Sequence, residues 1–208
     1  MLQERLQVDF PELHLVERDE TMIVAGTFPL VDGQKVVDRF MIELALPRTY
    51  PKGVPELREV GGRIPRVADR HVEGDGKACA FLPDEYCYKH PNGMDLIDFL
   101  KGPVLGFLVG QSLAERGQPW PQGERAHGTD GITAFYTEVV GSSDPATIQR
   151  YLEALAAKQV RGHWPCPCGS GKRLRECHQE RVLKIRERIP RSIARGSLER
   201  MRNGVPRP

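Results

Sequence analysis

Long apolar runs and a secretory leader are both missing from this sequence. No window approaches the roughly 18 apolar residues that indicate a membrane span. The first residues, MLQERLQVDFPELHL, lack the basic start and apolar stretch of a secretory signal. No internal repeat or low-complexity tract occurs, and 39% hydrophobic with 28% charged residues is the balance of a globular protein. We therefore expect a folded cytoplasmic protein without membrane contact.

The cysteines lack the number and spacing of a disulfide framework. The chain has five cysteines, an odd number, and three of them fall within twelve positions beside a histidine. Clustered cysteine and histidine in a protein without a secretory leader favours metal binding in a reducing compartment.

Acidic residues are scarce in the last quarter of the chain. Residues 158–208 contain 14 Lys or Arg against 4 Asp or Glu, which gives a net charge of +10. Residues 1–157 contain the remaining 16 Lys or Arg and 24 Asp or Glu, which gives a net charge of −8. A basic tail can attract nucleic acid, anionic lipid or an acidic protein surface, or it can be a solvated helix, which is the interpretation we favour.

The first half of the chain has the pattern of an antiparallel meander. A short helix is predicted at residues 2–10, and strands at 21–28, 36–46 and near 56–60. In the second of these strands Phe40, Ile42, Leu44 and Leu46 alternate with outward positions. Asp32 and Gly33 favour a hairpin turn between the first two. A long proline-rich and glycine-rich loop then leads to Cys79, and long ordered loops often carry function.

The second half is helical. Apolar periodicity predicts a helix from residue 95, broken at Gly102 and Pro103, and a further short helix at 132–140. Asp144 before Pro145 is a typical helix start. The expected organisation is an α+β domain at 1–141, a linker helix at 142–163, a small cysteine-histidine knuckle at 164–179 and a basic, helical or flexible tail at 180–208.

The stretch HWPCPCGSGKRLRECH contains a complete ligand set for a closed metal site. Three thiolates and one imidazole, from Cys166, Cys168, Cys177 and His178, form a tetrahedral zinc set with no position left for water. The stretch resembles the SEC-C zinc motif, which has Cys-x-Cys, a Gly-Ser-Gly turn, basic residues and then Cys-Cys or Cys-His. The resemblance implies structural zinc on these four residues. Such adaptor modules say little about the activity of their host.

A second resemblance covers residues 1–141. From Phe40 the chain reads FMIELALPRTYPKGVPELREVGGRIPRVADRHVEGDGKACAFL. A strand ends in proline, Tyr50-Pro51 and Pro55 follow, and a histidine and glycine precede a cysteine. This order resembles the core of ubiquitin-conjugating enzymes, and is most similar to divergent bacterial members, some of which belong to anti-phage operons. The resemblance implies a UBC-like fold, with a meander flanked by helices.

The resemblance also implies a transferase mechanism. Cys79 would be the nucleophile that accepts a ubiquitin-like carrier protein from an activating enzyme as a thioester and passes it to an amine. His71 would be the structural histidine. Val72 follows it where the family has an oxyanion-stabilising asparagine. Two other residues could stabilise the oxyanion in place of this asparagine: Asn92, which belongs to a literal His-Pro-Asn after Cys79, and His127. His127 could instead deprotonate the amine.

Several alternatives stay open at the level of sequence. Cys79 could be a small apolar core residue, although its polar loop GDGKACAF favours exposure. Lys77 could lower the pKa of a nearby thiol or be solvated, and Cys87 could be a second redox or transfer thiol. The leading hypothesis is a ubiquitin-conjugating-like transferase. A catalytically silent binding module of the same fold is the second, and a thiol redox protein is the third.

Overall fold

A computed structural model describes residues 2–120 and 128–204. The chain forms two compact units: Met1–Phe81 with Asn92–Glu124, and Leu82–Pro91 with Arg125–Pro208. This division differs from the expected boundary near residue 141. The helix that follows residue 128 packs its apolar side into the core of the C-terminal unit, and residues 82–91 join that core as well.

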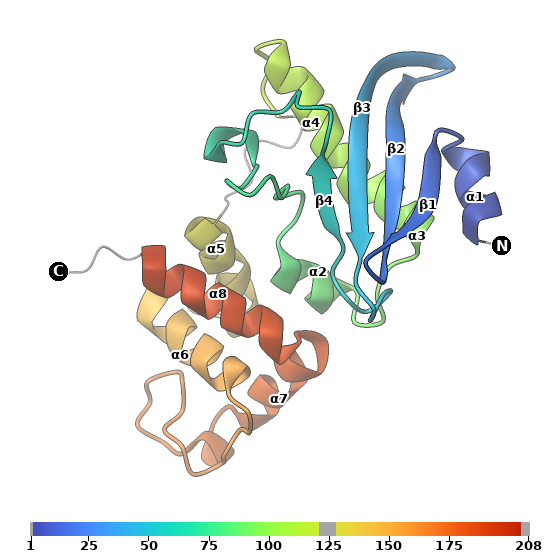
Figure 1. Ribbon diagram of the computed structural model, residues 1–208. Helices are drawn as coiled ribbons and strands as arrows, with labels where there is room; N and C mark the ends of the chain where they lie inside the picture. The colour runs from blue at the N-terminus through green and yellow to red at the C-terminus, as the bar shows by residue number, and fades with distance from the viewer. Residues whose placement is uncertain (1, 121–127, 205–208) are drawn as a thin grey trace. The chain divides into compact units, whose positions relative to one another are not determined.

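Unit 1 is built on a four-stranded antiparallel sheet, which confirms the predicted meander and adds a first strand, at Leu13–Arg18, that the sequence analysis did not predict. The strands β1 (Leu13–Arg18), β2 (Thr21–Asp32), β3 (Lys35–Leu46) and β4 (Glu56–Glu59) are neighbours in chain order (Figure 1). Asp32 pairs with Lys35, and Gly33 has the positive φ of 60° that the tight turn requires. The alternating residues of β3 point into the core and are at most 5% exposed: Phe40, Ile42, Leu44 and Leu46.

One long helix covers a face of this sheet. It begins with α3 (Leu96–Phe99), passes through a π-helical turn η2 (Leu100–Val104) and continues as α4 (Leu105–Glu115). The predicted break at Pro103 is therefore absent. Proline removes an amide hydrogen bond and crowds the preceding turn, and the wider π turn accommodates it without ending the helix.

This helix is longer and more apolar than the sequence analysis expected. By length and composition alone, residues Leu96–Glu115 pass as a helix able to cross a membrane. About half of that window, 56%, is buried inside the protein, as in the core helix of a soluble domain. It packs beneath the sheet with Phe99, Leu100 and Leu108, which are fully buried.

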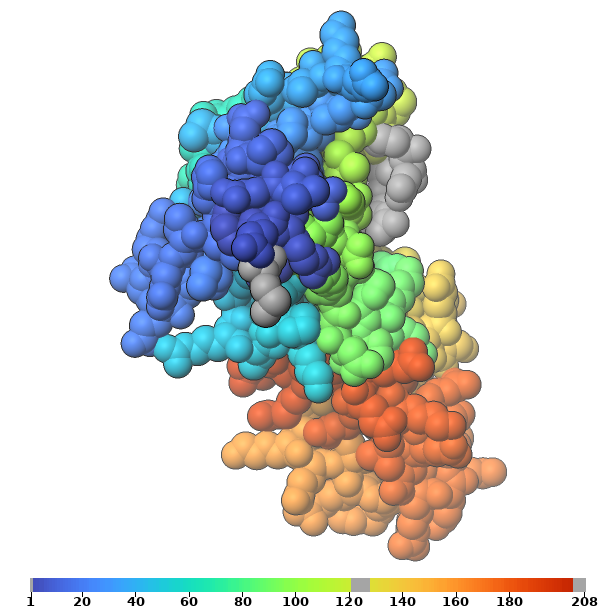
Figure 2. Space-filling model, turned by 90° about the vertical axis from the view of Figure 1, so that its right-hand side faces the viewer, coloured from blue at the N-terminus to red at the C-terminus, as the bar shows by residue number. Residues whose placement is uncertain are grey.

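Helix α1 (Leu2–Asp9) lies beside the start of the long helix. Figure 2 shows α1 in dark blue against the green residues of that helix. Arg5 donates two hydrogen bonds of 3.1 Å to Asp95, the residue that caps α3, and Lys101 donates to Asp9 at 2.7 Å. The N-terminal segment is thereby held in the unit by charged contacts.

Unit 2 is helical. Its elements are α2 (Pro83–Lys89), α5 (Gly128–Val140), α6 (Pro145–Ala156), a 3₁₀ turn η3 (Leu174–Glu176), α7 (Gln179–Arg188) and α8 (Arg191–Gly204). The predicted start of α6 is confirmed, because the Asp144 carboxylate accepts from the amides of Ala146 and Thr147. Helix α6 is more than the expected linker: Ile148, Leu152 and Leu155 are fully buried in the core of this unit.

The basic C-terminal segment is folded rather than a free tail. Val182, Ile185 and Leu198 are buried, and several arginines of α7 and α8 donate to backbone carbonyls near the ends of other helices. Arg181 donates to Val140 at 2.8 Å and Arg191 to Ala156 at 2.8 Å. The C-terminal end of a helix carries partial negative charge and unpaired carbonyls, so it attracts arginine. Much of the positive charge of α7 and α8 is therefore used inside the unit.

A buried carboxylate links three helices of unit 2. Asp84 of α2 is 1% exposed, and it accepts hydrogen bonds of 2.6 Å from the Tyr136 hydroxyl of α5 and from the Ser197 hydroxyl of α8. Burial raises the pKa of Asp84, and the two hydroxyl donors oppose that effect in part. The carboxylate fixes how α2, α5 and α8 pack together.

Candidate functional site

Cys79 lies at the end of a short hairpin that is attached to β4. The Cys79 amide donates to the His71 carbonyl at 2.7 Å, Val72 pairs with Ala78, and the Glu73 amide donates to the Lys77 carbonyl at 2.8 Å. The hairpin joins the sheet because the Ala78 amide donates to Leu57 of β4 at 2.8 Å. His71 and Cys79 are thus direct neighbours across the hairpin, a relation that the sequence did not define.

The inner side chains of the hairpin are buried and the thiol is not. Val72 and Ala78 are 7% and 9% exposed, whereas Cys79 is half-buried. The Cys79 thiol lies 3.9 Å from the Glu73 carboxylate, to which it can donate a hydrogen bond. Sequence reasoning missed Glu73, whose proximity to the thiol depends on the hairpin pairing.

His71 has the environment of a structural histidine. It is 8% exposed, and it adopts a left-handed backbone conformation with φ 52° at the end of a short 3₁₀ turn. Its ring contacts the edge of Trp120, with ring centroids 4.4 Å apart. The Trp120 ring also fills the space beside Gly110 of α4, where a Cβ atom would lie only 1.8 Å from it.

Arg63 fixes the loop before the hairpin to the sheet and to α4. Its guanidinium donates to Asp38 of β3 at 2.6 and 2.9 Å and to Glu115 at the end of α4 at distances down to 2.5 Å. It also lies 4.2 Å above the Phe40 ring. The hydrogen bond from Arg63 holds the pKa of Asp38 well below its usual value, and Ser112 adds a further donor.

A second arginine repeats this attachment nearer to the hairpin. The Arg70 guanidinium donates to the Gln111 side-chain oxygen at 2.8 Å, and the Gln111 amide donates back to the Arg70 carbonyl at 2.5 Å. Gln111 is fully buried. This reciprocal pair, directly before His71, makes the long loop an ordered support for Cys79.

The other predicted catalytic residues have different settings. Asn92 is exposed in the turn before Gly93, whose Cα packs against the Pro51 carbonyl beside the cis Tyr50-Pro51 bond. His127 lies outside the described residues. Lys77 donates to Glu56 at 2.7 Å, so its charge is engaged by β4.

Cys87 has the character of a core residue. It is 3% exposed, and burial, together with the charge of Asp84, raises the pKa of its thiol to about 11. A buried thiol with a raised pKa is a poor nucleophile at neutral pH. These properties do not favour the redox hypothesis, which used Cys87 as the second thiol.

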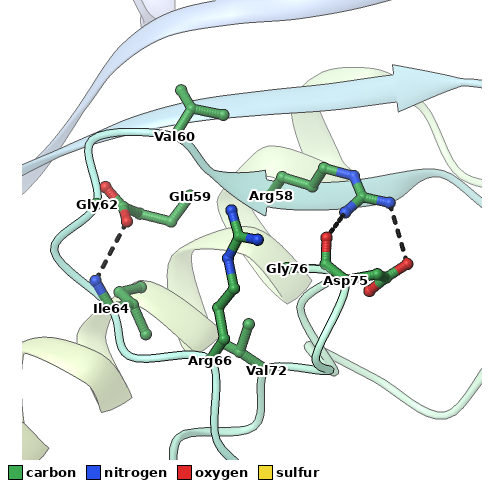
Figure 3. A pocket seen from close by; sticks show the side chains of 9 residues that line it. All are labelled: Arg58, Glu59, Val60, Gly62, Ile64, Arg66, Val72, Asp75 and Gly76. Atoms are coloured by element: carbon green, nitrogen blue, oxygen red, sulfur yellow. Dashed lines mark hydrogen bonds and ion pairs between the residues drawn. The ribbon is translucent and has the colours of Figure 1, made fainter.

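A shallow pocket of about 210 Å³ lies beside the turn of the hairpin (Figure 3). The Arg58 guanidinium donates to the Asp75 carbonyl at 2.5 Å, and the Glu59 carboxylate accepts from the amides of Arg63 and Ile64. These contacts tie the turn and the loop to β4. The lining residues, which do not include Cys79, are Arg58, Glu59, Val60, Gly62, Ile64, Arg66, Val72, Asp75 and Gly76.

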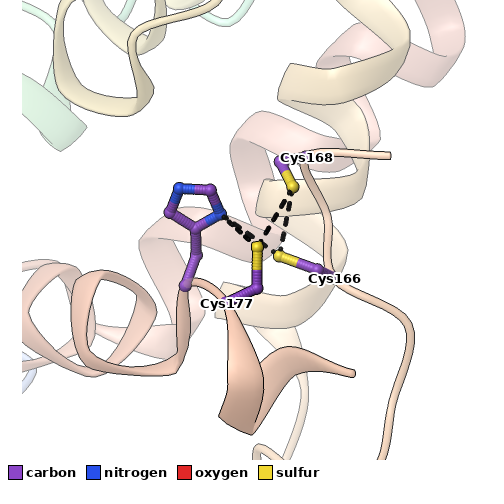
Figure 4. A group of neighbouring side chains, drawn as sticks. Cys166, Cys168 and Cys177 are labelled. Carbon is purple, nitrogen blue, oxygen red and sulfur yellow. Dashed lines mark hydrogen bonds between the residues drawn. The ribbon is translucent and has the colours of Figure 1, made fainter. Parts of the chain in front are cut away.

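The four predicted metal ligands come together in unit 2, before and at the start of α7 (Figure 4). The Nδ1 atom of His178 lies 3.3 Å from the Sγ atoms of both Cys166 and Cys177. The Cys168 Sγ atom is 3.4 Å from that of Cys166 and 3.7 Å from that of Cys177. A tetrahedral zinc ion with ordinary bond lengths requires S···S separations of about 3.8 Å and S···N separations of about 3.5 Å. The donor atoms therefore fit such an ion.

Backbone contacts hold the two halves of the cluster in place. The Cys166 amide donates to Lys172 at 2.9 Å, and the Leu174 amide donates to Trp164 at 2.7 Å. Gly169 and Gly171 have φ values of 79° and 75°, which explains the Gly-Ser-Gly turn. Arg150 of α6 donates to the Pro167 carbonyl at 2.9 Å. The knuckle is not a separate appendage, because Cys166 and Leu174 belong to the core of unit 2.

The thiols of the cluster differ in pKa. Burial raises the pKa of the Cys166 thiol to about 11. Burial acts in the same direction on Cys168, but hydrogen bonds from Ser170, Cys166 and Cys177 together outweigh it and lower the pKa of that thiol to about 6. Thiolates this close repel each other, and a divalent cation removes that repulsion. The Ser170 hydroxyl, 3.5 Å from Cys177 Sγ, was not predicted as part of this site.

Comparison with known protein families recognises this cluster. Residues 165–180 match the SEC-C motif. The match contains all four predicted ligands and the first residues of α7, so the predicted SEC-C motif is confirmed, and its Cys3His cluster is a candidate metal site. No curated protein and no solved structure matches the chain.

Proposed function

We propose that the protein is a ubiquitin-conjugating-like transferase in which Cys79 carries a ubiquitin-like protein as a thioester. The observation that carries the proposal is the placement of Cys79. A half-buried cysteine follows an N-terminal helix and a four-stranded antiparallel meander, is held opposite His71, and precedes further helices. This is the order of elements that the UBC resemblance implies.

The proposed reaction has two transfers at one sulfur atom. The Cys79 sulfur attacks the carrier's carboxy-terminal thioester carbonyl, and the thiolate of the activating enzyme leaves. Glu73, 3.9 Å away, is placed to accept the thiol proton. A target amine then attacks the same carbonyl carbon, the carbon–sulfur bond breaks, Cys79 leaves as a thiolate, and the proton that the amine nitrogen loses passes to solvent.

Oxyanion stabilisation must come from a group other than the usual asparagine. Val72 occupies the position after His71, and it is buried in the hairpin. The amide of Ala80, adjacent to the nucleophile, donates no hydrogen bond within the described part of the chain. We assign it as the nearest oxyanion donor, since backbone amides perform this role in acyl-transfer enzymes.

The SEC-C module has a structural role in this proposal. Zinc on Cys166, Cys168, Cys177 and His178 would stabilise the end of the helical core, and the complete protein ligand set leaves no position for a reacting water.

The test is acyl transfer from a chemical donor. A fluorescent peptide ending in Gly-Gly, activated as a mercaptoethanesulfonate thioester, should label the protein through a bond that dithiothreitol cleaves. Cys79→Ala should abolish the label and Cys87→Ala should retain it. We expect Glu73→Gln to slow labelling by about 10²-fold, the lower end of the usual range for a general base.

The alternative is a catalytically silent binding module of the same fold. The observation that favours it is Val72, which replaces the asparagine. Labelling of Cys79 no faster than that of free glutathione would support the silent module and overturn the transferase.

A further inference from the structure

Both walls of the pocket beside the hairpin turn are attached to the same strand. One wall is the loop at residues 60–66, whose Ile64 amide donates to the Glu59 carboxylate at 3.2 Å. The other wall is the hairpin turn, whose Asp75 carbonyl accepts from Arg58 at 2.5 Å. Glu59 and Arg58 both belong to β4. The sheet therefore holds the two walls at a fixed separation.

Arg66 brings a positive charge into this pocket. Its side chain is exposed, and the guanidinium points into the space between Glu59 and Arg58 (Figure 3). It makes no hydrogen bond or ion pair with any residue in the described part of the chain. Packing positions it instead, because a Cβ atom on the buried Gly76 would lie 3.2 Å from the Arg66 Cζ atom. The guanidinium thus rests on the glycine backbone with its N–H donors available.

The acidic groups around the pocket already have partners. The Glu59 carboxylate accepts from three backbone amides of the loop that follows it. The Asp75 carboxylate accepts from the Lys77 amide at 2.9 Å and pairs with Arg58 at 3.4 Å. A guanidinium whose N–H donors are available matches an anion, which it binds through two parallel hydrogen bonds. The charge of Arg66 is therefore suited to an anionic ligand.

We propose that this pocket binds a monocarboxylate with a short branched aliphatic chain. The carboxylate accepts from the Arg66 guanidinium. The aliphatic chain packs on Ile64 and Val72, which are 6% and 7% exposed, and covers Val60, which is 46% exposed. The volume of about 210 Å³ equals that of about seven water molecules, so a ligand of about seven non-hydrogen atoms fills it.

A carboxylate fits this pocket better than a phosphate. Its two oxygens match the planar fork of one guanidinium. A phosphate dianion needs more donors, and the carboxylates of Glu59 and Asp75 in the walls repel a second negative charge more strongly than a single one. Cys79 does not line the pocket, so this binding site is separate from the proposed acyl transfer.

The experiment is an NMR titration of the isotope-labelled full-length protein with isovalerate at constant ionic strength. The amide signals of Gly62, Asp75 and Gly76 should shift together. We expect a dissociation constant of about 1 mM, because so small a ligand forms few contacts. Arg66→Gln should weaken binding about tenfold or more, since charge-assisted hydrogen bonds are lost. Arg48→Gln removes an exposed arginine elsewhere in unit 1 and should change binding less than twofold.

Further ligands test the chemical class. Isovaleramide has the shape of isovalerate without its charge and should bind at least tenfold more weakly. Equal binding of the amide, unchanged binding in Arg66→Gln, or equally tight binding of inorganic phosphate would overturn the proposal. N-acetyl-leucine carries the carboxylate and branched chain of a peptide terminus. Tighter binding of N-acetyl-leucine than of isovalerate would identify a peptide C-terminus as the source of the proposed group, and weaker binding would identify a small free acid.

Discussion

The two cysteine sites of this protein are built in opposite ways. Four metal ligands lie within thirteen residues, from Cys166 to His178, and their donor atoms meet within 4.8 Å. The Cys79 site instead depends on contacts far apart in sequence, such as Arg63 with Asp38 and Glu115. A metal can organise a short segment because the bonds it forms are strong. A single thiol needs the surrounding fold to position it.

The largest expected effect comes from removing a metal ligand. Cys166→Ser should reduce bound zinc below half an equivalent and destabilise unit 2 by about 5 kcal/mol or more, part of the roughly 10–16 kcal/mol that zinc supplies to isolated fingers. Metal analysis and urea unfolding measure both effects. Cys79→Ser is the control and should keep full zinc. If the Cys166→Ser variant bound as much zinc as the wild type, Cys166 would not be a metal ligand, and the contrast between a metal site and a single-thiol site would be wrong.

A smaller effect is expected from the buried carboxylate of unit 2. Asp84→Ala leaves the buried hydroxyls of Tyr136 and Ser197 without their acceptor. It should lower the free energy of unfolding by about 3 kcal/mol. Asp84→Asn keeps an acceptor without the charge. Because folding raises the pKa of Asp84, its stabilising contribution is complete below the unfolded pKa of about 3.9 and is lost as pH rises.

Urea unfolding at pH 5 and pH 8 tests this sign. Asp84→Asn should gain stability relative to the wild type as the pH increases. A wild type that gains stability over Asp84→Asn towards pH 8 would contradict the assignment.

The packing of Trp120 gives the next effect. Gly110→Ala places a Cβ about where the Trp120 ring now lies, so the ring must leave His71. We expect a loss of about 2 kcal/mol and a red-shifted tryptophan emission. Gly106→Ala in the same helix meets no atom within 4 Å, and it should be neutral or stabilising by up to about 1 kcal/mol. Equal behaviour of the two variants would show that Trp120 does not support the hairpin.

The smallest effect concerns the Arg63 attachment. Folding lowers the pKa of Asp38, so its contribution is present above the unfolded value of about 3.9 and is lost as pH falls below it. Arg63 is 35% exposed, so solvent screening limits the cost of Asp38→Asn to about 1 kcal/mol at pH 7. The variant should also lose part of the acid sensitivity of unit 1 in urea unfolding. Glu20→Gln, which breaks an exposed pair with Arg48, should have no measurable effect.

Local patterns explain why much of the fold was predictable. The alternation of Phe40, Ile42 and Leu44 and the turn at Gly33 specify β3 and its hairpin with β2. Asp144 before Pro145 specifies the start of α6 in the same way. Each of these signals involves residues only a few positions apart, where backbone geometry and burial follow directly from residue type.

Other features lay beyond local patterns. The π turn at Pro103 depends on the helix being held against the sheet, which local helix signals do not report. The folded state of residues 180–204 depends on a core shared with α5 and α6. Charge composition suggested a solvated tail, because it does not show which arginines find carbonyl partners.

The sequence by itself determined the candidate metal site, since ligand type, ligand spacing and the Gly-Ser-Gly turn are all local properties of one segment. It also determined the meander that precedes Cys79. Only the tertiary structure decided that Cys79 faces Glu73 and pairs with His71, that Cys87 is buried, and that Arg181 and Arg191 donate to helix-end carbonyls. These relations depend on which distant segments pack together, and a thiol or a guanidinium acquires its chemical character from those neighbours.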